Sequence, residues 1–142
     1  MRLLQQHTQI LERSTCWETE AVSSSGVPDA SCPNFLNMAV CIATGLTPQA
    51  LKTELVNPIE KALGRVRSAD KYAPRTIDLD IVVYDDQILE QALWQRSYLA
   101  LTLAELLPDL RHSQTGETLR EAALRLGKDH LAIPHYDFDK AA

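Results

Sequence analysis

The chain has 142 residues, of which 45% are hydrophobic and 23% are charged, and its formal net charge is −5 at pH 7. These values are typical of a soluble globular protein, so we expect a single domain over residues 1–142. The acidic balance argues against nucleic acid as a partner. No apolar run approaches the roughly 20 residues that a membrane span needs, and the N-terminus lacks the features of a secretory signal.

The pattern of cysteines indicates a cellular compartment. Cys16, Cys32 and Cys41 are odd in number and include no C-x-x-C pair. This argues against a disulfide framework and against a zinc–thiolate site. A reducing cytoplasm is therefore the expected location.

Apolar spacing predicts the elements of the first part of the chain. Residues 1–11 fit an amphipathic helix, residues 13–22 a strand, and residues 23–33 a loop. Residues 35–44 alternate as a strand, which places Phe35, Asn37, Ala39 and Cys41 on one face.

A helix is predicted to follow this strand. Thr47 is a good N-cap, Pro48 suits the first helical position, and Gly64 ends the apolar pattern. Pro58 predicts a kink inside this helix. The remaining segments are predicted as a basic loop over 65–76, a strand over 77–84, and helices over 99–107 and 118–126. Thr118 and Glu121 form a capping box for the last helix. These elements indicate an α/β or α+β domain with at least three strands, mostly antiparallel, and helices covering the sheet.

Two aspartates stand side by side in the predicted strand 77–84. Asp78 and Asp80 alternate with aliphatic residues and therefore project from one face, about 7 Å apart at a rise of about 3.3 Å per residue. Val82 and Tyr84 continue that face and are apolar, so a plain solvated face fits poorly. A divalent cation would relieve the repulsion, since Mg²⁺ takes one or two carboxylates plus substrate phosphates. A solvated strand face is the alternative interpretation.

The loop before this strand is basic. Of the 14 Lys and Arg residues, 5 lie in the window 61–75. Arg65, Arg67, Lys71 and Arg75 could bind phosphate oxygens, or they could be a solvated loop. Next to two carboxylates, they are the groups that Mg-nucleotide chemistry uses. The common Gly-rich nucleotide motifs are absent from the sequence.

Asn37 is a polar amide among apolar neighbours, so it must find hydrogen-bond partners. A structural hydrogen bond to a neighbouring loop is one explanation. The other is that the amide pairs with a flat heterocycle stacked on Phe35.

The segment KYAPRTIDLDIVV (71–83) resembles the signature of the hydroxymethyldihydropterin pyrophosphokinases of the folate pathway. IEKALGRVR (59–67), FLNMAV (35–40) and QRSYLAL (95–101) resemble further segments of that family. The resemblance implies an α+β fold with a ferredoxin-like antiparallel sheet covered by helices. It also implies the transfer of pyrophosphate from ATP to the pterin hydroxymethyl group with Mg²⁺.

The resemblance further implies the roles of individual residues. Asp78 and Asp80 would hold both Mg²⁺ ions that the family uses and, with Arg65 and Arg75, would be catalytic. The residues implied to contact ATP are Glu60, Arg65, Arg67, Tyr72, Arg75, Arg96, His135 and Tyr136. The residues implied to contact the pterin are Phe35, Asn37 and Tyr98. The expected partners are therefore ATP and a reduced pterin, bound by a monomer or a weak homodimer.

Two departures from the family pattern are expected to matter. The family begins with a strand that ends in Gly-Ser-Asn, whereas this chain begins at the following helix, so its start is misassigned or truncated, or another segment fills that place. The family's Pro-His-Tyr-Asp segment precedes the stretch that QRSYLAL resembles, whereas here IPHYDFD lies at 133–139. The alternative to an active enzyme is therefore a catalytically impaired or inactive pterin- or nucleotide-binding relative that lacks the first strand.

Overall fold

The computed structural model describes residues 1–21, 27–64, 77–128 and 131–135. The chain divides into two compact units that alternate along the sequence. Unit 1 comprises Met1–Gln9 and Ala43–Glu90, and unit 2 comprises Ile10–Ile42 and Gln91–Ala142. The expected α+β class is confirmed, because antiparallel strand pairs and helices both occur. A single domain over 1–142 stays a prediction.

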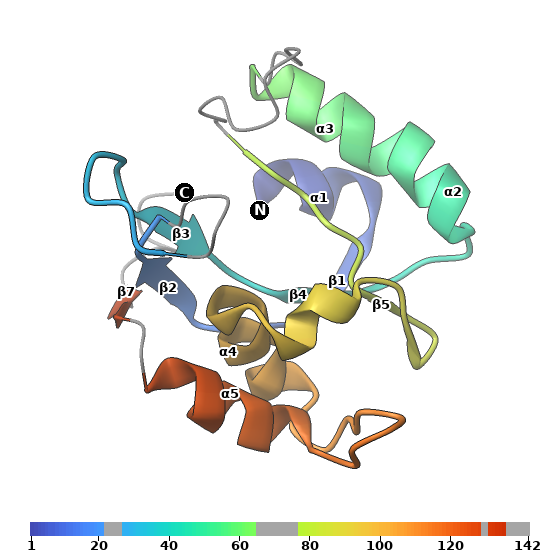
Figure 1. Ribbon diagram of the computed structural model, residues 1–142. Coiled ribbons are helices and arrows are strands. Elements are labelled where there is room, and N and C mark those ends of the chain that lie inside the picture. Colours follow the sequence, from blue (N-terminus) through green and yellow to red (C-terminus); the bar gives the residue numbers. More distant parts are fainter. Residues whose placement is uncertain (22–26, 65–76, 129–130, 136–142) are drawn as a thin grey trace. The chain divides into compact units, whose positions relative to one another are not determined.

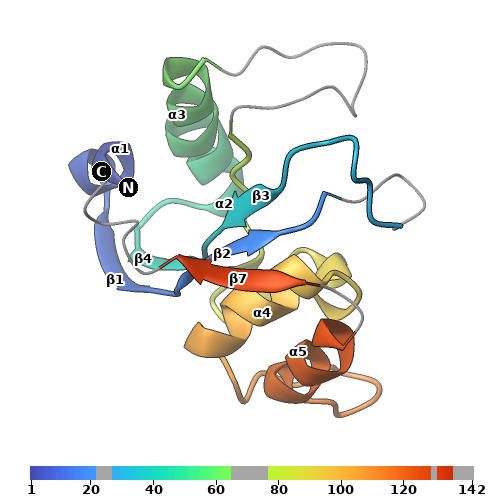
Figure 2. The same ribbon diagram turned by 90° about the vertical axis from the view of Figure 1, so that its left-hand side faces the viewer.

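Unit 2 contains a three-stranded antiparallel sheet in the order β3-β2-β7. Its strands are β2 (Cys16–Thr19), β3 (Phe35–Asn37) and β7 (Ala132–His135). Trp17 lies opposite Asn37 on one side and Pro134 on the other. Figure 2 shows the three strands side by side. The central strand therefore takes partners from distant parts of the sequence.

The strand predicted over 35–44 is interrupted in the structure. After β3, a second strand, β4 (Val40–Ala43), pairs with β1 (Gln9–Arg13). Between β3 and β4, the backbone N–H of Ala39 donates to Oγ of Ser14 at 2.9 Å, and the Ser14 N–H donates to the Ala39 carbonyl at 2.8 Å. Because Ser14 satisfies both backbone groups of Ala39, the chain can leave one ladder and enter another.

The helix predicted over 1–11 is shorter than expected. Helix α1 covers Arg2–His7, and Thr8 after it is extended, with φ −157° and ψ 162°. The Thr8 hydroxyl donates to the carbonyl of Ala43 at 2.9 Å. The prediction was wrong for residues 9–11, which belong to β1, because a local apolar pattern does not reveal a pairing with a strand that is distant in sequence.

The remaining helices of unit 2 pack together and carry its core. They are η2 (Gln91–Trp94, a 3₁₀ helix), α4 (Ser97–Leu106) and α5 (Leu119–Gly127). Helices α4 and α5 lie against each other (Figure 1), and Leu93, Ala100, Leu119 and Ala122 are fully buried. The two helices predicted over 99–107 and 118–126 are therefore confirmed.

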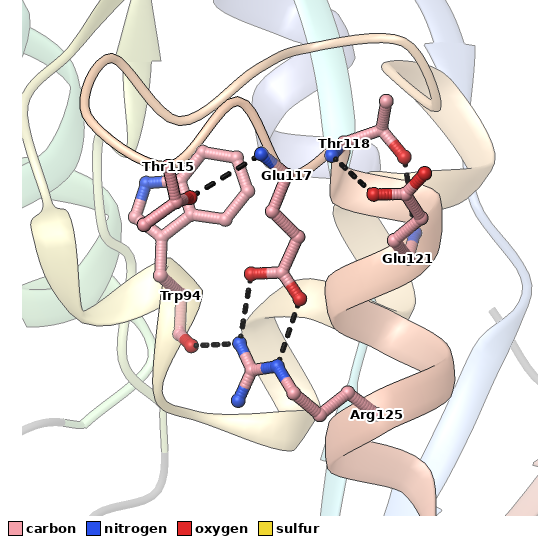
Figure 3. A network of polar contacts seen from close by, with 6 residues as sticks. All are labelled: Trp94, Thr115, Glu117, Thr118, Glu121 and Arg125. Atoms are coloured by element: carbon pink, nitrogen blue, oxygen red, sulfur yellow. Dashed lines mark hydrogen bonds and ion pairs between the residues drawn. The ribbon is translucent and has the colours of Figure 1, made fainter.

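A network of polar side chains caps the N-terminus of α5 and links the helix to the segments beside it (Figure 3). The predicted capping box is present, because Thr118 Oγ1 accepts from the Glu121 N–H and the Glu121 carboxylate accepts from the Thr118 N–H. One turn further on, Arg125 donates to both carboxylate oxygens of Glu117, at 2.8 and 3.0 Å, and to the Trp94 carbonyl at 3.0 Å. The hydrogen bond from Arg125 lowers the pKa of Glu117.

In unit 1, the predicted helix 47–64 is one continuous coil with an unusual centre (Figure 1). It comprises α2 (Pro48–Leu51), the π-helical η1 (Lys52–Val56) and α3 (Asn57–Ala62). Thr47 is the N-cap, as predicted, and Gly64 has a φ of 86°. Because Pro58 has no backbone N–H to donate, the α-helical ladder cannot be regular before it, and the chain widens into a π turn there.

The strand predicted over 77–84 is wrong for residues 77–82. The strand β5 covers only Val83–Tyr84 and pairs with β6 (Gln87–Ile88) as a hairpin. Asp85 and Asp86 form the two-residue turn with φ values of 46° and 64°, the left-handed pair that tight hairpins use. Residues 77–82 belong to no strand in the described part of the chain. Alternation of apolar residues thus predicted the two faces of this segment without identifying a partner strand.

Among the helices that the structure describes, none combines the length and apolarity that crossing a membrane requires.

Candidate active site

In unit 1, the two candidate metal ligands, Asp78 and Asp80, are both exposed in a segment that belongs to no strand. Ile77, Leu79 and Ile81 alternate with them and are half-buried. The burial thus alternates along this segment as predicted, although the segment is not a regular strand. Two hard carboxylate donors that reach solvent, two residues apart, fit a cation that also binds water and phosphate.

Glu60 is held next to this segment by helix α3. Its residue is only 4% exposed, and its Oε1 accepts a hydrogen bond of 2.9 Å from the backbone N–H of Leu79. The resemblance implied a contact between Glu60 and the nucleotide. The structure shows that this carboxylate binds the chain between Asp78 and Asp80.

Several predicted nucleotide contacts lie outside the described residues. They are Arg65, Arg67, Tyr72, Arg75 and Tyr136. Within the described residues, no group of three or more His, Cys, Asp and Glu side chains is arranged to hold a metal ion. Among the residues that the structure describes, Asp78 and Asp80 therefore remain the candidate metal ligands.

In unit 2, Phe35 and Asn37 lie on one face of β3, as predicted. Phe35 is 51% exposed, and Asn37 is half-buried. Opposite them on β2 are Thr19 and Trp17, respectively. The Asn37 amide donates to the hydroxyl of Thr19 at 2.6 Å. Asn37 therefore makes the structural hydrogen bond that was considered for it. Its partner lies on a neighbouring strand, whereas a loop was expected.

Thr19 is a residue that the sequence patterns did not single out. It is only 7% exposed, and its hydroxyl fixes which way the Asn37 amide group faces. An amide whose N–H is already committed presents its other donor and its carbonyl in a defined direction. The sequence does show Thr19 two residues after Trp17 in a predicted strand. Its hydrogen bond with Asn37, however, depends on the register between β2 and β3, which the sequence does not reveal.

Arg96 and Tyr98 lie at the start of helix α4. Arg96 is the N-cap residue, and Tyr98 lies in the first turn, where its carbonyl accepts from the Thr102 hydroxyl at 2.9 Å. Both side chains are half-buried. They belong to the same unit as Phe35 and Asn37.

His135 has a protein partner on the neighbouring strand. Its Nε2 lies 2.7 Å from Oε2 of Glu18, and Asn34 donates to the other oxygen of Glu18 at 3.1 Å. The hydrogen bond with His135, followed by that from Asn34, lowers the pKa of Glu18. His135 was predicted to reach the nucleotide, and the structure shows it anchoring β7 to β2.

The three cysteines lie among the described residues, and Cys16 is the buried one. All three are free, and burial raises the pKa of the Cys16 thiol. A thiol with a raised pKa is a poor nucleophile at neutral pH.

Antiparallel sheets with packed helices define the chain as an α+β protein. A family model for 7,8-dihydro-6-hydroxymethylpterin-pyrophosphokinase (HPPK) matches residues 1–108. The chain belongs to this family, which confirms the resemblance drawn from the segment 71–83.

Curated relatives carry the same description. A 2-amino-4-hydroxy-6-hydroxymethyldihydropteridine pyrophosphokinase of Methylorubrum extorquens is 42% identical over 100 residues, which is 65% of this chain and 61% of the relative. The Synechocystis protein of that name is 35% identical over 61% of this chain and 48% of the relative. The Bacillus subtilis protein is 31% identical over 94% of this chain and 82% of the relative. The matched region thus spans less than two thirds of the length of the first two relatives.

Proposed function

We propose that this protein transfers pyrophosphate from ATP to the hydroxymethyl group of 6-hydroxymethyl-7,8-dihydropterin, a step of folate biosynthesis. The observation that carries the proposal is the family match over residues 1–108, a range that includes the exposed Asp78 and Asp80. In this reaction the hydroxymethyl oxygen bonds to the β-phosphorus of ATP. The bond from that phosphorus to the oxygen bridging to the α-phosphate breaks, AMP leaves, and the hydroxyl proton is released.

Asp78 and Asp80 are proposed to hold Mg²⁺. Their two exposed carboxylates supply hard oxygen donors and leave room for phosphate oxygens and water, which Mg²⁺ prefers as further ligands. When bound, the ion would neutralise charge on the ATP phosphates. The aspartates themselves bind and orient.

The ATP phosphates are proposed to be bound by arginines. Arginine presents a planar fork of donors that matches phosphate oxygens, and several such forks offset the charge that moves during transfer. The residues proposed for this role are Arg65, Arg67, Arg75 and Arg96, with Arg65 and Arg75 closest to the chemistry. Tyr72, Tyr136 and His135 are proposed as further nucleotide contacts, His135 with Glu18 as its partner.

The pterin is proposed to bind at Phe35, Asn37 and Tyr98. A pterin is flat and rich in donors and acceptors, so aromatic faces and an oriented amide suit it. The exposed ring of Phe35 and the fixed amide of Asn37 on one face of β3 support this assignment. The chemistry needs alignment and charge neutralisation and requires no protein nucleophile.

We also propose a cytoplasmic location and a monomeric or weakly dimeric state, with ATP and the pterin as partners and without nucleic acid or membrane. Three free cysteines support a reducing compartment.

The test is a coupled assay for AMP with purified protein, ATP, Mg²⁺ and the pterin. Wild-type protein should form AMP only when the pterin is present, and Asp78→Asn should lose about 10²–10³-fold in turnover. Asp86→Asn is the matched control, because this exposed aspartate lies in the hairpin turn of the same unit at φ 64°, a conformation that Asn accepts. Folded wild-type protein without pterin-dependent AMP formation would refute the proposal and favour an inactive binding protein.

A further inference from the structure

The hydrogen bond from Leu79 to Glu60 lies between the two candidate metal ligands. The N–H of Leu79 belongs to the peptide plane that joins Asp78 to Leu79, and Oε1 of Glu60 accepts from it at 2.9 Å. Fixing this plane restricts ψ of Asp78 and φ of Leu79. These are two of the four backbone torsions that set the direction of the Asp78 side chain relative to that of Asp80.

Residues 77–82 belong to no strand in the described ranges, although the Val82 carbonyl accepts from the backbone N–H groups of Leu89 and Glu90. A side-chain acceptor can fix a peptide plane in such an irregular segment. Glu60 is 4% exposed and sits on a helix whose neighbouring Ile59 is also buried, which fixes the position of its carboxylate.

We infer that Glu60 is a positioning residue for the metal-binding aspartates. By holding the Asp78–Leu79 peptide, its side chain keeps the carboxylates of Asp78 and Asp80 oriented to bind a divalent cation. The inference rests on the proposed function for the identity of the ligand, since it concerns the same aspartate pair. It gives Glu60 a task that is distinct from the nucleotide contact implied by the resemblance.

Two substitutions at this position separate positioning from charge. Glu60→Gln keeps an oxygen acceptor at the same reach and removes the charge. Glu60→Asp keeps the charge and withdraws the acceptor by one methylene. Positioning predicts that Gln is tolerated and Asp is harmful, whereas a role for the negative charge predicts the opposite order.

The measurement is Mn²⁺ binding to the nucleotide-free full chain by electron paramagnetic resonance, with Asp78→Asn defining the signal of the aspartate site. Glu60→Gln should bind within about twofold of wild type, and Glu60→Asp should bind about tenfold more weakly. In ¹⁵N spectra, the Leu79 amide should exchange faster with solvent in Glu60→Asp than in Glu60→Gln. Glu54→Gln and Glu54→Asp are matched controls, because Glu54 is exposed on the same continuous helix, and both should behave as wild type.

Weak binding by Glu60→Gln with retained binding by Glu60→Asp would overturn the inference, as would equal binding by all variants. A wild-type chain that binds no Mn²⁺ at Asp78 would overturn it as well. A wild-type chain that binds Mn²⁺ with the expected order of variants, but forms no AMP, would support the inference and refute the proposed function. The two failures are therefore distinguishable.

Discussion

The indole N–H of Trp17 donates a hydrogen bond of 2.6 Å to Oε1 of Glu105, which ties strand β2 to helix α4. The other oxygen of this carboxylate accepts from the backbone N–H of Thr15 at 2.8 Å. A single side chain of α4 thus holds both the entry to β2 and an aromatic residue of that strand. Since Trp17 lies opposite Asn37, this contact also supports the face on which the pterin is proposed to bind.

We predict that Glu105→Ala lowers the free energy of unfolding by about 1–3 kcal/mol, because two donors lose a charged acceptor. Glu105→Gln, which retains one oxygen acceptor, should lose less. Urea unfolding followed by the fluorescence of the tryptophans measures both. Glu54→Ala is the control, as an exposed glutamate in the other unit. Equal stability of Glu105→Ala and wild type would contradict the role of this contact.

The pair of Arg125 and Glu117 should give a pH-dependent contribution to stability. Arg125 lowers the pKa of Glu117 from its ordinary value of 4.5 in the folded chain. A carboxylate with a depressed folded pKa stabilises the fold above its unfolded pKa, and this contribution disappears as the pH falls through the folded value. We predict that Arg125→Gln costs about 1 kcal/mol at pH 7 and less at pH 3.

Part of the cost of Arg125→Gln should persist in acid, because Arg125 also donates to the Trp94 carbonyl at 3.0 Å. Arg120→Gln is the matched control, since its contact with Asp109 is longer, at 3.8 Å, and more exposed. Denaturant titrations at the two pH values provide the comparison. If Arg125→Gln became more destabilising as the pH fell, the ion pair with Glu117 would not be the source of its effect on stability.

The contact between His135 and Glu18 allows structural and nucleotide roles of His135 to be separated. Removing either side chain should loosen β7, so His135→Gln and Glu18→Gln should each increase amide exchange in residues 132–135, and the double variant should add little. If His135 also contacts ATP, only His135→Gln should raise the KM for ATP directly. An equal rise in both variants would mean that the effect runs through the attachment of β7.

Thr19 should act on pterin binding through Asn37. Thr19→Val keeps the shape of the side chain but removes the oxygen that accepts from the Asn37 amide at 2.6 Å. We predict that the KM for the pterin rises about tenfold while the KM for ATP is unchanged, because one amide orientation is no longer favoured. Thr19→Ser retains the hydroxyl and serves as the control. A change in the KM for ATP of the same size would point to a general loss of folding.

Local signals in the sequence predicted the elements whose causes are local. Thr118 and Glu121 identified the start of α5, and Thr47 with Pro48 identified the start of α2, because caps depend on residues within one turn. The KYAPRTIDLDIVV segment identified the family and the aspartate pair. It could not predict that residues 77–82 would lie outside the strands of the described part of the chain, or that Glu60 would accept a hydrogen bond from Leu79, 19 residues away.

Elements that depend on partners distant in the sequence were missed, because local signals carry no information about such partners. Strand β7 has only four residues, including Pro134, and nothing in its own sequence reveals that it pairs with β2. The Ser14–Ala39 contact that divides the predicted strand 35–44 is likewise set by tertiary register. Arg65, Arg67, Tyr72, Arg75 and Tyr136 lie outside the described residues, so their roles stay predictions.

The pairing of β2 with β7 has a consequence for synthesis of the chain on the ribosome. Residues 16–19 emerge early, but the strand that covers one of their edges is not made until residues 132–135. During that interval β2 can pair with β3 on one side, while its other edge presents unpaired backbone groups to any nearby strand. We therefore expect a chaperone to protect this edge of β2 until residues 132–135 are available to pair with it. A ribosome-bound chain stalled before that residue should remain more sensitive to proteolysis at β2 than the finished protein.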